Sequence, residues 1–503
     1  MGEQSEVIAF LSAGASYGLP GGSVTRIETH ISVVFLAGQF AYKLKRAVRF
    51  SYLDYSTVTL REKCCRAELA LNQRTAPELY RRVSAVTRER DGSLAFDGAG
   101  KILDWVVEMC RFEQSALFDQ MAVAGKLTPA LLRALTDEIA EFHEAAEITP
   151  GYGGAVALQA VLAGNDANLV AAAPPLEHAA VMRMNAAAWA RLAVVGPLLD
   201  ARRDTKKIRR CHGDLHLGNI TLSESRPALF DCIEFNEAFS CIDVLYDLAF
   251  LLMDLLHRDL RDFASLVFNR YLDLTGDSGG LPVLGLFMSA RAAIRAHVLA
   301  AQGHGEIGQT YLMLAEELLD TRQPCLVAVG GLSGSGKSTL AAALARDFAP
   351  APGARVVRSD VIRKALAGVA PEVRLPPVAY AAEVSAAVYA ELHHQVREAL
   401  DAGFSVVADA TFLSAAGRRE IAALAQEKGV AFFGLWLEAP EAVLQARLAA
   451  RRNDASDAGA EVLRRQRLTD VGTLDWRRID MTQGMEQQRR EIAALIAGQD
   501  ALA

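Results

Sequence analysis

The feature that most constrains the fold of this chain is the run Gly331-Leu-Ser-Gly-Ser-Gly-Lys-Ser. It matches the pattern G-x-x-x-x-G-K-[ST] at every fixed position. The short apolar segment 325–330 before it is typical of a strand, and the helix formers from Thr339 onward are typical of a helix. A glycine loop between a strand and a helix can turn backbone N–H groups toward phosphate oxygens, and the helix N-terminus adds positive potential. The sequence therefore predicts a nucleoside triphosphate site.

Two side chains of this loop have expected roles of their own. Lys337 is expected to hold the β- and γ-phosphates, and the hydroxyl of Ser338 is expected to ligate Mg²⁺. A Gly/Ser-rich turn without a ligand is the alternative, but the strand and helix on either side favour the nucleotide site. The cofactors predicted are therefore ATP and Mg²⁺, although no residue distinguishes ATP from GTP. The residues predicted to contact the nucleotide are Gly331, Ser333, Gly334, Ser335, Gly336, Lys337, Ser338 and Thr339.

The length of 503 residues is too great for one ordinary hydrophobic core. Segment 309–319 is typical of the end of a helix, and 321–325 leads into the strand before the glycine loop. We therefore predict one domain over residues 1–320 and a second over 321–503. Short apolar strands alternate with helical stretches in the second domain, which predicts an α/β fold with a parallel sheet covered by helices. The strands expected there are 325–330, 355–358, 405–408 and 431–437.

The first domain is patterned differently. A helix-like segment, 60–76, interrupts the strand signals of its first hundred residues, and from residue 127 onward the pattern is mostly helical. We therefore predict an α+β domain with a small sheet-bearing lobe followed by a larger helical lobe. The strands expected in the small lobe are 24–28, 31–36, 40–44 and 102–108.

Composition narrows the possible partners. The net charge of −7 argues against general nucleic-acid binding, so nucleic acid is an unlikely partner. None of the seven cysteines forms a CxxC pair, which indicates reduced structural thiols. The N-terminus lacks the basic start and apolar core of a signal peptide, and no uncharged apolar run reaches 18 residues. We therefore expect a soluble, cytoplasmic protein with no membrane partner, and nothing in the sequence specifies its oligomeric state.

The most informative stretch of the first domain reads Cys211-His-Gly-Asp-Leu-His-Leu-Gly-Asn-Ile, and Asp231-Cys-Ile-Glu-Phe-Asn follows it. Both stretches resemble the aminoglycoside-phosphotransferase-like kinases, whose catalytic loop reads His-Gly-Asp-Leu-His-x-x-Asn and is followed by a metal-binding Asp. The resemblance implies a bilobal kinase-like fold in which Asp214 accepts or orients the proton of the attacking hydroxyl. It also implies Asn219 and Asp231 as Mg²⁺ ligands. A carboxylate base beside oxygen ligands of a metal suits phosphoryl transfer, which needs positioning and neutralised charge.

A kinase-like small lobe also implies a lysine on its third strand and a glutamate on the following helix. Either Lys43 or Lys45 can supply the ammonium group, and Lys43 matches the family pattern better; Glu68 is its expected partner. Solvated surface charges are the alternative for these residues. The tight turn near 28–30 has no glycine, unlike the usual glycine-rich phosphate loop. A degenerate lobe that binds nucleotide without catalysing is therefore a second possibility.

Four further polar residues flank or follow the catalytic loop. His212 and His216 are expected to shape the loop through hydrogen bonds, with zinc binding as the alternative. Asp243 and Asp247 resemble the helix entry of the same kinases, and structural support of the loop is expected in preference to direct catalysis.

The second domain carries two carboxylates at predicted strand ends. The stretch Val356-Val-Arg-Ser-Asp-Val-Ile-Arg is similar to the segment after the second strand of small-molecule and polynucleotide P-loop kinases. That likeness implies Asp360 as the base that faces the acceptor hydroxyl and Arg363 as a substrate-holding residue, with a helix N-cap as the alternative for Asp360. Asp409 ends the next strand, at the sheet edge where ligands gather, so it is expected to reach Mg²⁺ or its waters.

Three arginines of the second domain are spaced for one helical face. Arg447, Arg451 and Arg452 precede the stretch Asn-Asp-Ala-Ser-Asp, which suits a mobile loop. The segment resembles the lid of nucleotide-type kinases, and the likeness implies that Arg447 and Arg451 stabilise charge on the transferring phosphoryl group. A solvated helix face is the alternative.

Taken whole, the chain resembles proteins that fuse an aminoglycoside-phosphotransferase-like domain to a P-loop kinase-like ATPase domain. The function implied is a Mg·ATP-dependent phosphotransferase with two nucleotide sites, each delivering the γ-phosphoryl group to a hydroxyl of a small molecule. A polynucleotide 5′-hydroxyl kinase and an ATP-binding regulatory protein with a degenerate kinase domain are the two alternatives.

Overall fold

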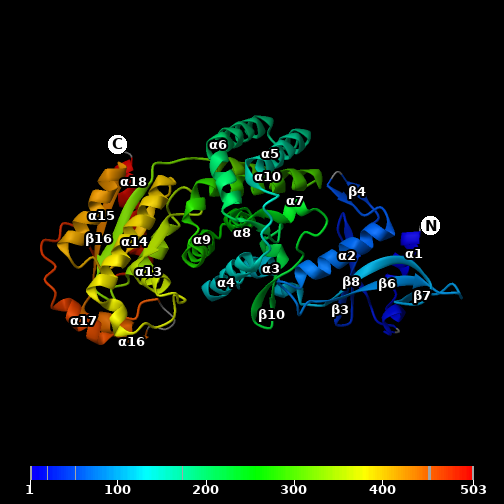
Figure 1. Ribbon diagram of the computed structural model, residues 1–503, viewed down its shortest axis with the longest axis horizontal. Coiled ribbons are helices and arrows are strands. Elements are labelled where there is room, and N and C mark those ends of the chain that lie inside the picture. Colours follow the sequence, from blue (N-terminus) through cyan, green and yellow to red (C-terminus); the bar gives the residue numbers. More distant parts are fainter. Residues whose placement is uncertain (1–2, 20, 51, 173, 451–454, 501–503) are drawn as a thin grey trace. The chain divides into compact units, whose positions relative to one another are not determined.

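The computed structural model describes residues 3–19, 21–50, 52–172, 174–450 and 455–500 (Figure 1). The chain forms two compact units, each built from two stretches of sequence. Unit 1 consists of Met1–Leu158 and Leu199–Leu251, and unit 2 consists of Gln159–Leu198 and Leu252–Ala503. These units do not coincide with a cut at residue 321, so the domains 1–320 and 321–503 stay a prediction.

Unit 1 contains a six-stranded antiparallel sheet in the order β1-β2-β3-β8-β6-β7. All four strands predicted for the small lobe are present, and helix α2 lies along the sheet against β8 and β6 (Figure 1). The sequence analysis did not anticipate α1, β6 and β7. The elements are α1 (Glu3–Ser12), β1 (Thr25–Glu28), β2 (Ser32–Ala37), β3 (Phe40–Lys45), β4 (Arg49–Phe50), β5 (Leu53–Asp54), α2 (Val58–Asn72), β6 (Tyr80–Arg88), β7 (Leu94–Phe96) and β8 (Lys101–Cys110).

Strand β3 separates its apolar and charged side chains by simple alternation. Tyr42 and Leu44 point into a core that also holds Val33, Phe35 and Val106. Because successive side chains of a strand point to opposite faces, Lys43 and Lys45 both project from the other face of β3. The strand therefore places two lysines on one face of the sheet.

The rest of unit 1 is mainly helical, as predicted, but two small two-stranded sheets interrupt the helices. One is the β10–β11 hairpin, whose register pairs Ile220 with Leu229. Asn219 and Phe230 therefore lie at the same end of the hairpin, next to Asp231. The elements are α3 (Phe118–Val123), α4 (Pro129–Ala145), α5 (Gly154–Ala171), α6 (His178–Asp204), β9 (Ile208–Arg210), β10 (Ile220–Ser223), β11 (Arg226–Leu229), α7 (Glu237–Ser240), β12 (Cys241–Asp243) and α8 (Val244–His257), with α5, α6 and α8 continuing into unit 2.

Unit 2 contains a five-stranded, fully parallel sheet in the order β14-β15-β13-β16-β17. The four predicted strands are confirmed, and β17 is an addition at one edge. Together the two sheets confirm the predicted mixture of α+β and α/β architecture. The elements are α9 (Arg261–Thr275), α10 (Leu281–Ala301), α11 (Gly305–Glu317), β13 (Cys325–Gly331), α12 (Lys337–Ala345), β14 (Arg355–Arg358), α13 (Ser359–Leu366), α14 (Ala382–Asp401), β15 (Val406–Asp409), α15 (Ala415–Lys428), β16 (Ala431–Glu438), α16 (Glu441–Ala450), α17 (Ala460–Arg467), β17 (Arg477–Asp480) and α18 (Met485–Asp500).

The core of this sheet forms around its central strand. Val327 and Val329 of β13 are fully buried, and they pack with Leu340 and Leu344 of α12 in one apolar cluster. Burying a side chain of this size stabilises a fold by about 1.5–3 kcal/mol. The same packing fixes where β13 ends and where α12 begins, so it sets the path of the glycine loop between them.

Helix α9 closes the outer edge of the sheet at β14. The side chain of Asn269 accepts a hydrogen bond from Val356 N at 2.7 Å and donates one to Ala354 O at 3.1 Å. Beside it, Asp273 pairs with the buried Arg355 at 2.6 Å. One amide side chain therefore takes the place of a neighbouring strand, and the edge strand keeps its backbone groups paired.

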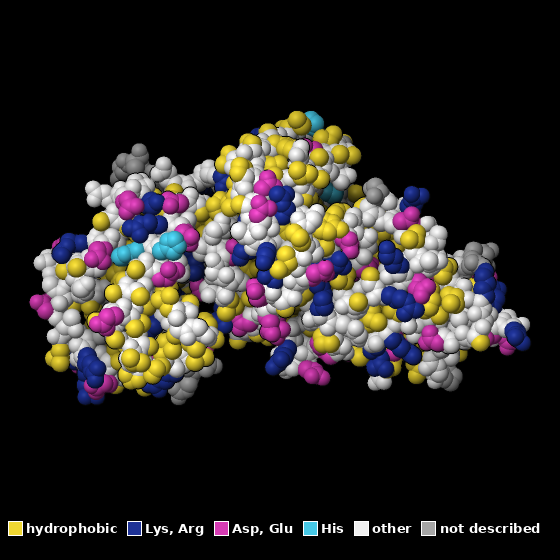
Figure 2. Space-filling model, in the orientation of Figure 1, with side chains coloured by type: hydrophobic (Ala, Val, Ile, Leu, Met, Phe, Trp, Pro, Cys, Tyr) yellow, Lys and Arg dark blue, Asp and Glu magenta, His cyan; other side chains and the backbone are white. Residues whose placement is uncertain are grey.

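Two properties of the structure concern membrane contact and surface charge. One helix among the described residues, Ser278–Ala301, is long and apolar enough to span a membrane, but 67% of its most apolar window is buried, as in a core helix. On the face drawn in Figure 2, Lys and Arg side chains are interspersed with Asp and Glu over both units.

The first prediction concerns the closed edge of the sheet. Asn269→Ala removes the side-chain hydrogen bonds to Val356 N of β14 and to Ala354 O just before it, along with weaker contacts to Ser265 and Arg355. Two backbone groups at this edge then lose their partner, so we expect unit 2 to lose about 1–3 kcal/mol of unfolding free energy. Denaturant unfolding followed by tryptophan fluorescence measures this loss, because Trp436 and Trp476 lie in unit 2. Asn168→Ala, at an exposed helix position, is the matched control. Equal midpoints for the two variants would contradict the role given to Asn269.

Candidate functional site

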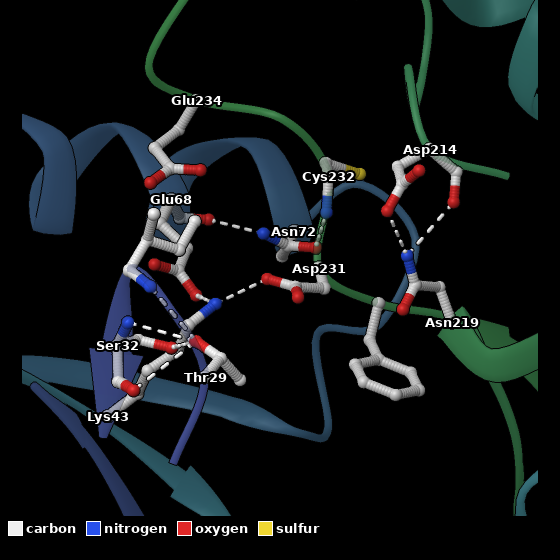
Figure 3. Close-up of polar contacts among 12 residues, drawn as sticks. Thr29, Ser32, Lys43, Glu68, Asn72, Asp214, Asn219, Asp231, Cys232 and Glu234 are labelled. Atoms are coloured by element: carbon white, nitrogen blue, oxygen red, sulfur yellow. Dashed lines mark hydrogen bonds and ion pairs between the residues drawn. The ribbon is translucent and has the colours of Figure 1, made fainter. Parts of the chain in front are cut away.

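The candidate site of unit 1 is built around a fully buried carboxylate. Glu68 of α2 accepts a hydrogen bond from Lys43 Nζ at 2.9 Å and another from Lys45 Nζ at 2.6 Å. Glu68 has no exposed surface, and Lys45 is only 1% exposed. The pairing expected between Lys43 and Glu68 is thus present (Figure 3). Lys45 shares the same carboxylate, so the two lysines are not alternatives.

Each lysine also contacts a second acid. The ammonium group of Lys43 forms an ion pair with Asp231, and that of Lys45 forms one with Glu234, which also accepts a hydrogen bond from Tyr55. Acids and bases therefore alternate along a continuous chain that joins the sheet, α2 and the segment after β11. Figure 3 shows Lys43 directed toward the carboxylate of Asp231.

The pKa shifts follow from this alternation. Burial alone would raise the pKa of Glu68, but the two ammonium groups lower it to about 2. Burial would likewise lower the pKa of Lys43, yet the carboxylates of Asp231 and Glu68 raise it above its ordinary value. Glu68 and the two lysines are therefore held in their charged forms near neutral pH.

The predicted catalytic loop lies on the other side of Asp231. Asn219 Nδ2 donates to Asp214 Oδ2 at 2.8 Å and to its backbone oxygen at 2.9 Å, which fixes the carboxylate of Asp214. Asp231 has a φ of +66°, a left-handed conformation that is costly for a residue with a side chain. The side-chain oxygens of Asn219 and Asp231 suit a hard divalent cation, and the two residues lie at the same end of the β10–β11 hairpin.

Asp247 holds the backbone of the predicted catalytic loop. Its carboxylate accepts the backbone N–H groups of His212 at 3.0 Å and Gly213 at 2.8 Å, and it contacts His143 Nε2 at 3.1 Å. Asp243 is instead held by both donors of Arg202, at 2.7 and 2.8 Å. Asp247 therefore contacts the loop as its expected supporting role requires, whereas the loop support expected of Asp243 stays a prediction.

The two histidines of the loop make local hydrogen bonds. His212 Nε2 lies 2.9 Å from Phe230 O, and His216 Nδ1 accepts from Gly218 N at 3.1 Å. His216 Nε2 then faces Asp214 Oδ2 at 3.5 Å. Among the described residues, neither histidine belongs to a cluster of three or more candidate metal ligands. These contacts agree with the loop-shaping role and leave the zinc alternative without support.

The turn between β1 and β2 differs from a glycine-rich phosphate loop, as the sequence indicated. Thr29 Oγ1 accepts hydrogen bonds from Ile31 N at 3.3 Å and Ser32 N at 2.9 Å. A hydroxyl therefore already engages two backbone N–H groups that a glycine loop would offer to phosphate.

The candidate site of unit 2 begins at the glycine loop between β13 and α12. Gly331 has a φ of +137° and Gly334 a φ of +84°, and a Cβ atom at either would lie 2.6–2.7 Å from a backbone oxygen. Ser335 Oγ is buried without a hydrogen-bond partner. A cradle that only glycine can form, with an unsatisfied hydroxyl in it, fits the phosphate tail of a nucleotide.

The remaining predicted ligands lie at the same edge of the sheet. The parallel register pairs Val329 of β13 with Asp409 of β15, so Asp409 lies beside the start of the glycine loop. Its carboxylate pairs with Arg358 at 3.4 Å, while Lys337 Nζ donates to Leu332 O at 3.0 Å. Lys337, Ser338 and Asp409 all line one cavity, where an oxygen-coordinated cation could be held by Ser338 and Asp409.

Asp360 lies in the first turn of α13 and lines the same cavity. The N-cap of α13 is Arg358, with no side-chain capping bond, so the N-cap alternative for Asp360 has no support. Burial raises the pKa of Asp360, and a hydrogen bond from the Ser456 hydroxyl partly offsets this effect. A carboxylate whose pKa is raised in this way is a better proton acceptor than an exposed one.

Asp457 holds in place a short segment before α17 that lines the cavity. Its carboxylate accepts hydrogen bonds from Lys364 Nζ at 2.5 Å, Tyr380 OH at 2.6 Å and Leu375 N at 2.9 Å. Although burial would raise the pKa of Asp457, these donors lower it. Because Ser456 is the neighbouring residue, the same fastening holds its hydroxyl on Asp360.

The arginines occupy places that the lid comparison did not anticipate. Arg447 donates to Ser335 O at 3.2 Å and to Met481 O at 2.8 Å, so it braces the glycine loop from outside. Arg451 and Arg452 lie outside the described residues. Arg363 donates to Ala379 O at 2.7 Å and lines the cavity. The catalytic role of Arg447 and Arg451 and the substrate-binding role of Arg363 stay predictions.

Several residues of these sites were not predicted from the sequence. In the sequence, the one indication that Glu234 belongs to the site is that it follows the predicted metal ligand Asp231 by three residues. Gln466 accepts the N–H of Ser333 at 2.8 Å from a helix more than a hundred residues away, so no local pattern reveals it. Tyr55 and Asp457 are likewise brought in by tertiary packing.

Two protein-family models match different parts of the chain. The model of the phosphotransferase enzyme family matches residues 75–283, and the model of the AAA domain matches residues 326–469. The chain thus joins a phosphotransferase-like domain to a P-loop kinase-like domain, which confirms the resemblance inferred from the motifs.

Uncharacterized proteins of Mycobacterium bovis and Mycobacterium tuberculosis are each 30% identical to this chain over 451 residues, which is 86% of this chain and 88% of theirs. Among solved structures, an aminoglycoside 2′-phosphotransferase in its GDP complex is 16% identical, with 59% of this chain and 92% of that chain covered at a TM-score of 0.38. An APS kinase of M. tuberculosis is 20% identical, with 35% and 98% covered at a TM-score of 0.26.

The second prediction concerns the buried charges of unit 1. Because folding lowers the pKa of Glu68 from 4.5 to about 2, its ionised form stabilises the fold above pH 4.5 and loses this effect as the pH falls toward 2. Glu68→Gln leaves two buried lysines with one partner fewer, so it should cost about 3 kcal/mol at pH 7. The difference in unfolding free energy between wild type and variant should therefore shrink on acidification below pH 4.5.

Glu62→Gln, at a partly exposed position of the same helix, is the matched control and should change little at any pH. A wild-type advantage that stays constant from pH 7 to pH 3 would contradict the assigned charge state of Glu68.

Proposed function

The chain belongs to the same family as these mycobacterial proteins, and we propose that it is a Mg·ATP-dependent phosphotransferase with two nucleotide sites. Each site would transfer the γ-phosphoryl group of ATP to a hydroxyl of a small molecule. The observation that carries the proposal is the cavity of unit 2, in which Lys337, Asp360 and Asp409 converge beside a glycine-only cradle. Lysine, base and oxygen ligands are the parts that phosphoryl transfer requires.

In unit 2 we assign each residue a role in phosphoryl transfer from its place in the cavity. The glycine loop and Lys337 would bind the phosphate tail, and Ser338 and Asp409 would hold Mg²⁺, which neutralises charge on the phosphates when bound. Asp360 is placed to accept the proton of the acceptor hydroxyl, and Ser456 orients its carboxylate. The segment held by Asp457 forms part of the cavity wall beside Asp360.

In unit 1 the corresponding parts come from different elements. Lys43 would bind phosphate oxygens, while Asn219 and Asp231 would hold Mg²⁺. Lys43 must then exchange its contact with Asp231 for one with the nucleotide, and Lys45 keeps Glu68 paired throughout this exchange. Asp214, fixed by Asn219, is placed to accept the hydroxyl proton.

One observation favours a second candidate function for unit 1. The β1–β2 turn uses the Thr29 hydroxyl to engage the N–H groups that a phosphate loop would offer, so unit 1 has fewer free donors for nucleotide. A unit that binds ATP weakly and regulates the other site is consistent with this turn. The variants described next separate regulation from catalysis.

The third prediction separates the two activities. Lys337→Ala should abolish transfer by unit 2, because it removes the ammonium group that binds the phosphates, and Asp214→Ala should abolish transfer by unit 1, because it removes the base. ATP turnover by each purified variant, screened against a library of hydroxyl metabolites, measures both activities. Each variant should lose one set of acceptors by at least about a hundredfold, which is within the usual effect of a lost general base.

Retention of every acceptor by Asp214→Ala would instead support the regulatory reading of unit 1. If neither substitution reduces any turnover, the phosphotransferase proposal is wrong. Glu62→Gln, which lies outside both sites, serves as the control for protein preparation and folding.

The fourth prediction concerns the pH dependence of unit 2. Because burial raises the pKa of Asp360 and the base must be ionised, kcat should rise with pH through a limb above the ordinary carboxyl range. Ser456→Ala removes a hydrogen bond that favours the ionised form, so it should move this limb to higher pH. Measurement of kcat from pH 4 to 9 for wild type and Ser456→Ala tests this, and an unmoved limb would contradict the contact between Ser456 and Asp360.

A further inference from the structure

We propose that the acceptor pocket of unit 2 takes an uncharged, polyhydroxylated molecule about the size of a monosaccharide. The inference rests on the proposed phosphotransfer at this site and specifies its substrate class. It excludes anionic acceptors such as nucleotides, sugar acids and polynucleotide ends.

The size of the cavity sets the first limit. Its volume is about 410 Å³, near the lower end of the range for small-molecule sites. The glycine loop, Lys337 and Ser338 line one part, which leaves the remainder for the acceptor. The side chains that line this remainder are Asp360, Arg363, Tyr380, Ser385, Tyr389, Thr411, Leu413, Ser456 and Asp457.

The cations near this remainder are already engaged. Arg363 donates Nη1 to Ala379 O at 2.7 Å, and its guanidinium lies 4.7 Å from the centre of the Tyr380 ring. Arg358 pairs with Asp409, and the fully buried Lys364 pairs with Asp457. Within the described part of the chain, Arg358 and Lys364 therefore each have a carboxylate partner that an anionic substrate would have to displace, whereas Arg363 contacts a backbone oxygen and an aromatic ring.

The acids of the pocket also disfavour a negative charge. Asp360 must be ionised to act as a base, and its described hydrogen-bond partner is a neutral hydroxyl, that of Ser456. An acceptor carboxylate or phosphate bound beside it would repel this charge and suppress its ionisation. An uncharged acceptor leaves the base free to ionise.

The remaining polar groups suit hydroxyl groups. Arg363 lines the cavity and is only 8% exposed, and its buried Nε has no hydrogen-bond partner, so this side chain has one N–H donor left for an acceptor hydroxyl. The hydroxyls of Ser385, Tyr389 and Thr411 add groups that both donate and accept. The aromatic ring of Tyr380 offers an apolar face against which the C–H groups of a sugar ring could pack.

The reaction balances with this acceptor and ATP alone. The oxygen of the acceptor hydroxyl forms a bond to the γ-phosphorus, and the bond from that phosphorus to the β,γ-bridging oxygen breaks. The bridging oxygen keeps the electron pair and leaves as part of ADP, while the hydroxyl proton passes to Asp360. The product is a neutral polyol converted into its phosphate monoester.

The test uses acceptor pairs that share a hydroxyl skeleton and differ in charge. The full-length Asp214→Ala protein, in which only unit 2 can act, is incubated with Mg·ATP and each acceptor, and kcat/KM is obtained from the phosphorylated product by mass spectrometry. The pairs are glucose with gluconate, galactose with galacturonate, ribitol with ribitol 5-phosphate and myo-inositol with inositol 1-phosphate. A 5′-hydroxyl oligonucleotide represents the polynucleotide end.

We expect at least one neutral member to be phosphorylated with a kcat/KM at least tenfold above that of its anionic partner. A higher kcat/KM for the anionic member, transfer to the oligonucleotide in preference to the neutral acceptors, or no transfer to any neutral member overturns the inference. Transfer to anionic members alone, if abolished by Lys337→Ala, would leave the proposed phosphotransfer standing. Loss of Lys337-dependent ATP binding would instead count against the phosphotransfer itself.

A variant at Arg363 tests the hydrogen-bond part of the argument. Arg363→Gln should raise the KM for the neutral acceptor about fivefold, as expected for one lost hydrogen bond, and leave the KM for ATP unchanged. Arg374→Gln, an exposed arginine nearby in the sequence, is the matched control and should change neither KM. An unchanged acceptor KM in Arg363→Gln would overturn the role given to its Nε.

Discussion

A charge taken out of water must find a partner, and this requirement shapes unit 1 more than any other interaction. Asp231, Lys43, Glu68, Lys45 and Glu234 satisfy it by alternating in sign along one continuous chain. Removing any member leaves at least one neighbour with one partner fewer. The same chain connects the sheet, helix α2 and the segment after β11, so electrostatic pairing also determines how the parts of the site are held together.

Unit 2 accommodates its charged groups with a different arrangement. Its predicted phosphate site depends on backbone groups, because the glycine loop has no room for side chains at Gly331 and Gly334. Two separate ion pairs lie at the cavity, Asp457 with Lys364 and Asp409 with Arg358. One unit therefore relies on a shared network of buried ions, and the other relies on a backbone cradle surrounded by separate ion pairs.

The parts of these sites that sequence reasoning could predict are those determined by local pattern. Strand and helix periodicity identified β13 and β3, and motif spacing identified Lys337 and Asp214 with their surroundings. The partners that arrive through tertiary packing were not predictable. Gln466 reaches the glycine loop from a distant helix, and Glu234 contacts Lys45 across 189 residues of sequence. Lys45 was considered only as a substitute for Lys43, because periodicity shows that two lysines share a face but not that one glutamate serves both.

The asparagine that replaces a neighbouring strand at β14 has a consequence for dissecting the protein. Asn269 belongs to α9, which precedes the glycine loop by some sixty residues and falls within the match to the phosphotransferase family. A fragment that starts at residue 321 would lack it, and the bare backbone of β14 could then recruit strands from other molecules. Isolating the nucleotide-binding half at the boundary suggested by its motifs would therefore favour self-association, whereas a fragment that begins before α9 would keep this flank shielded.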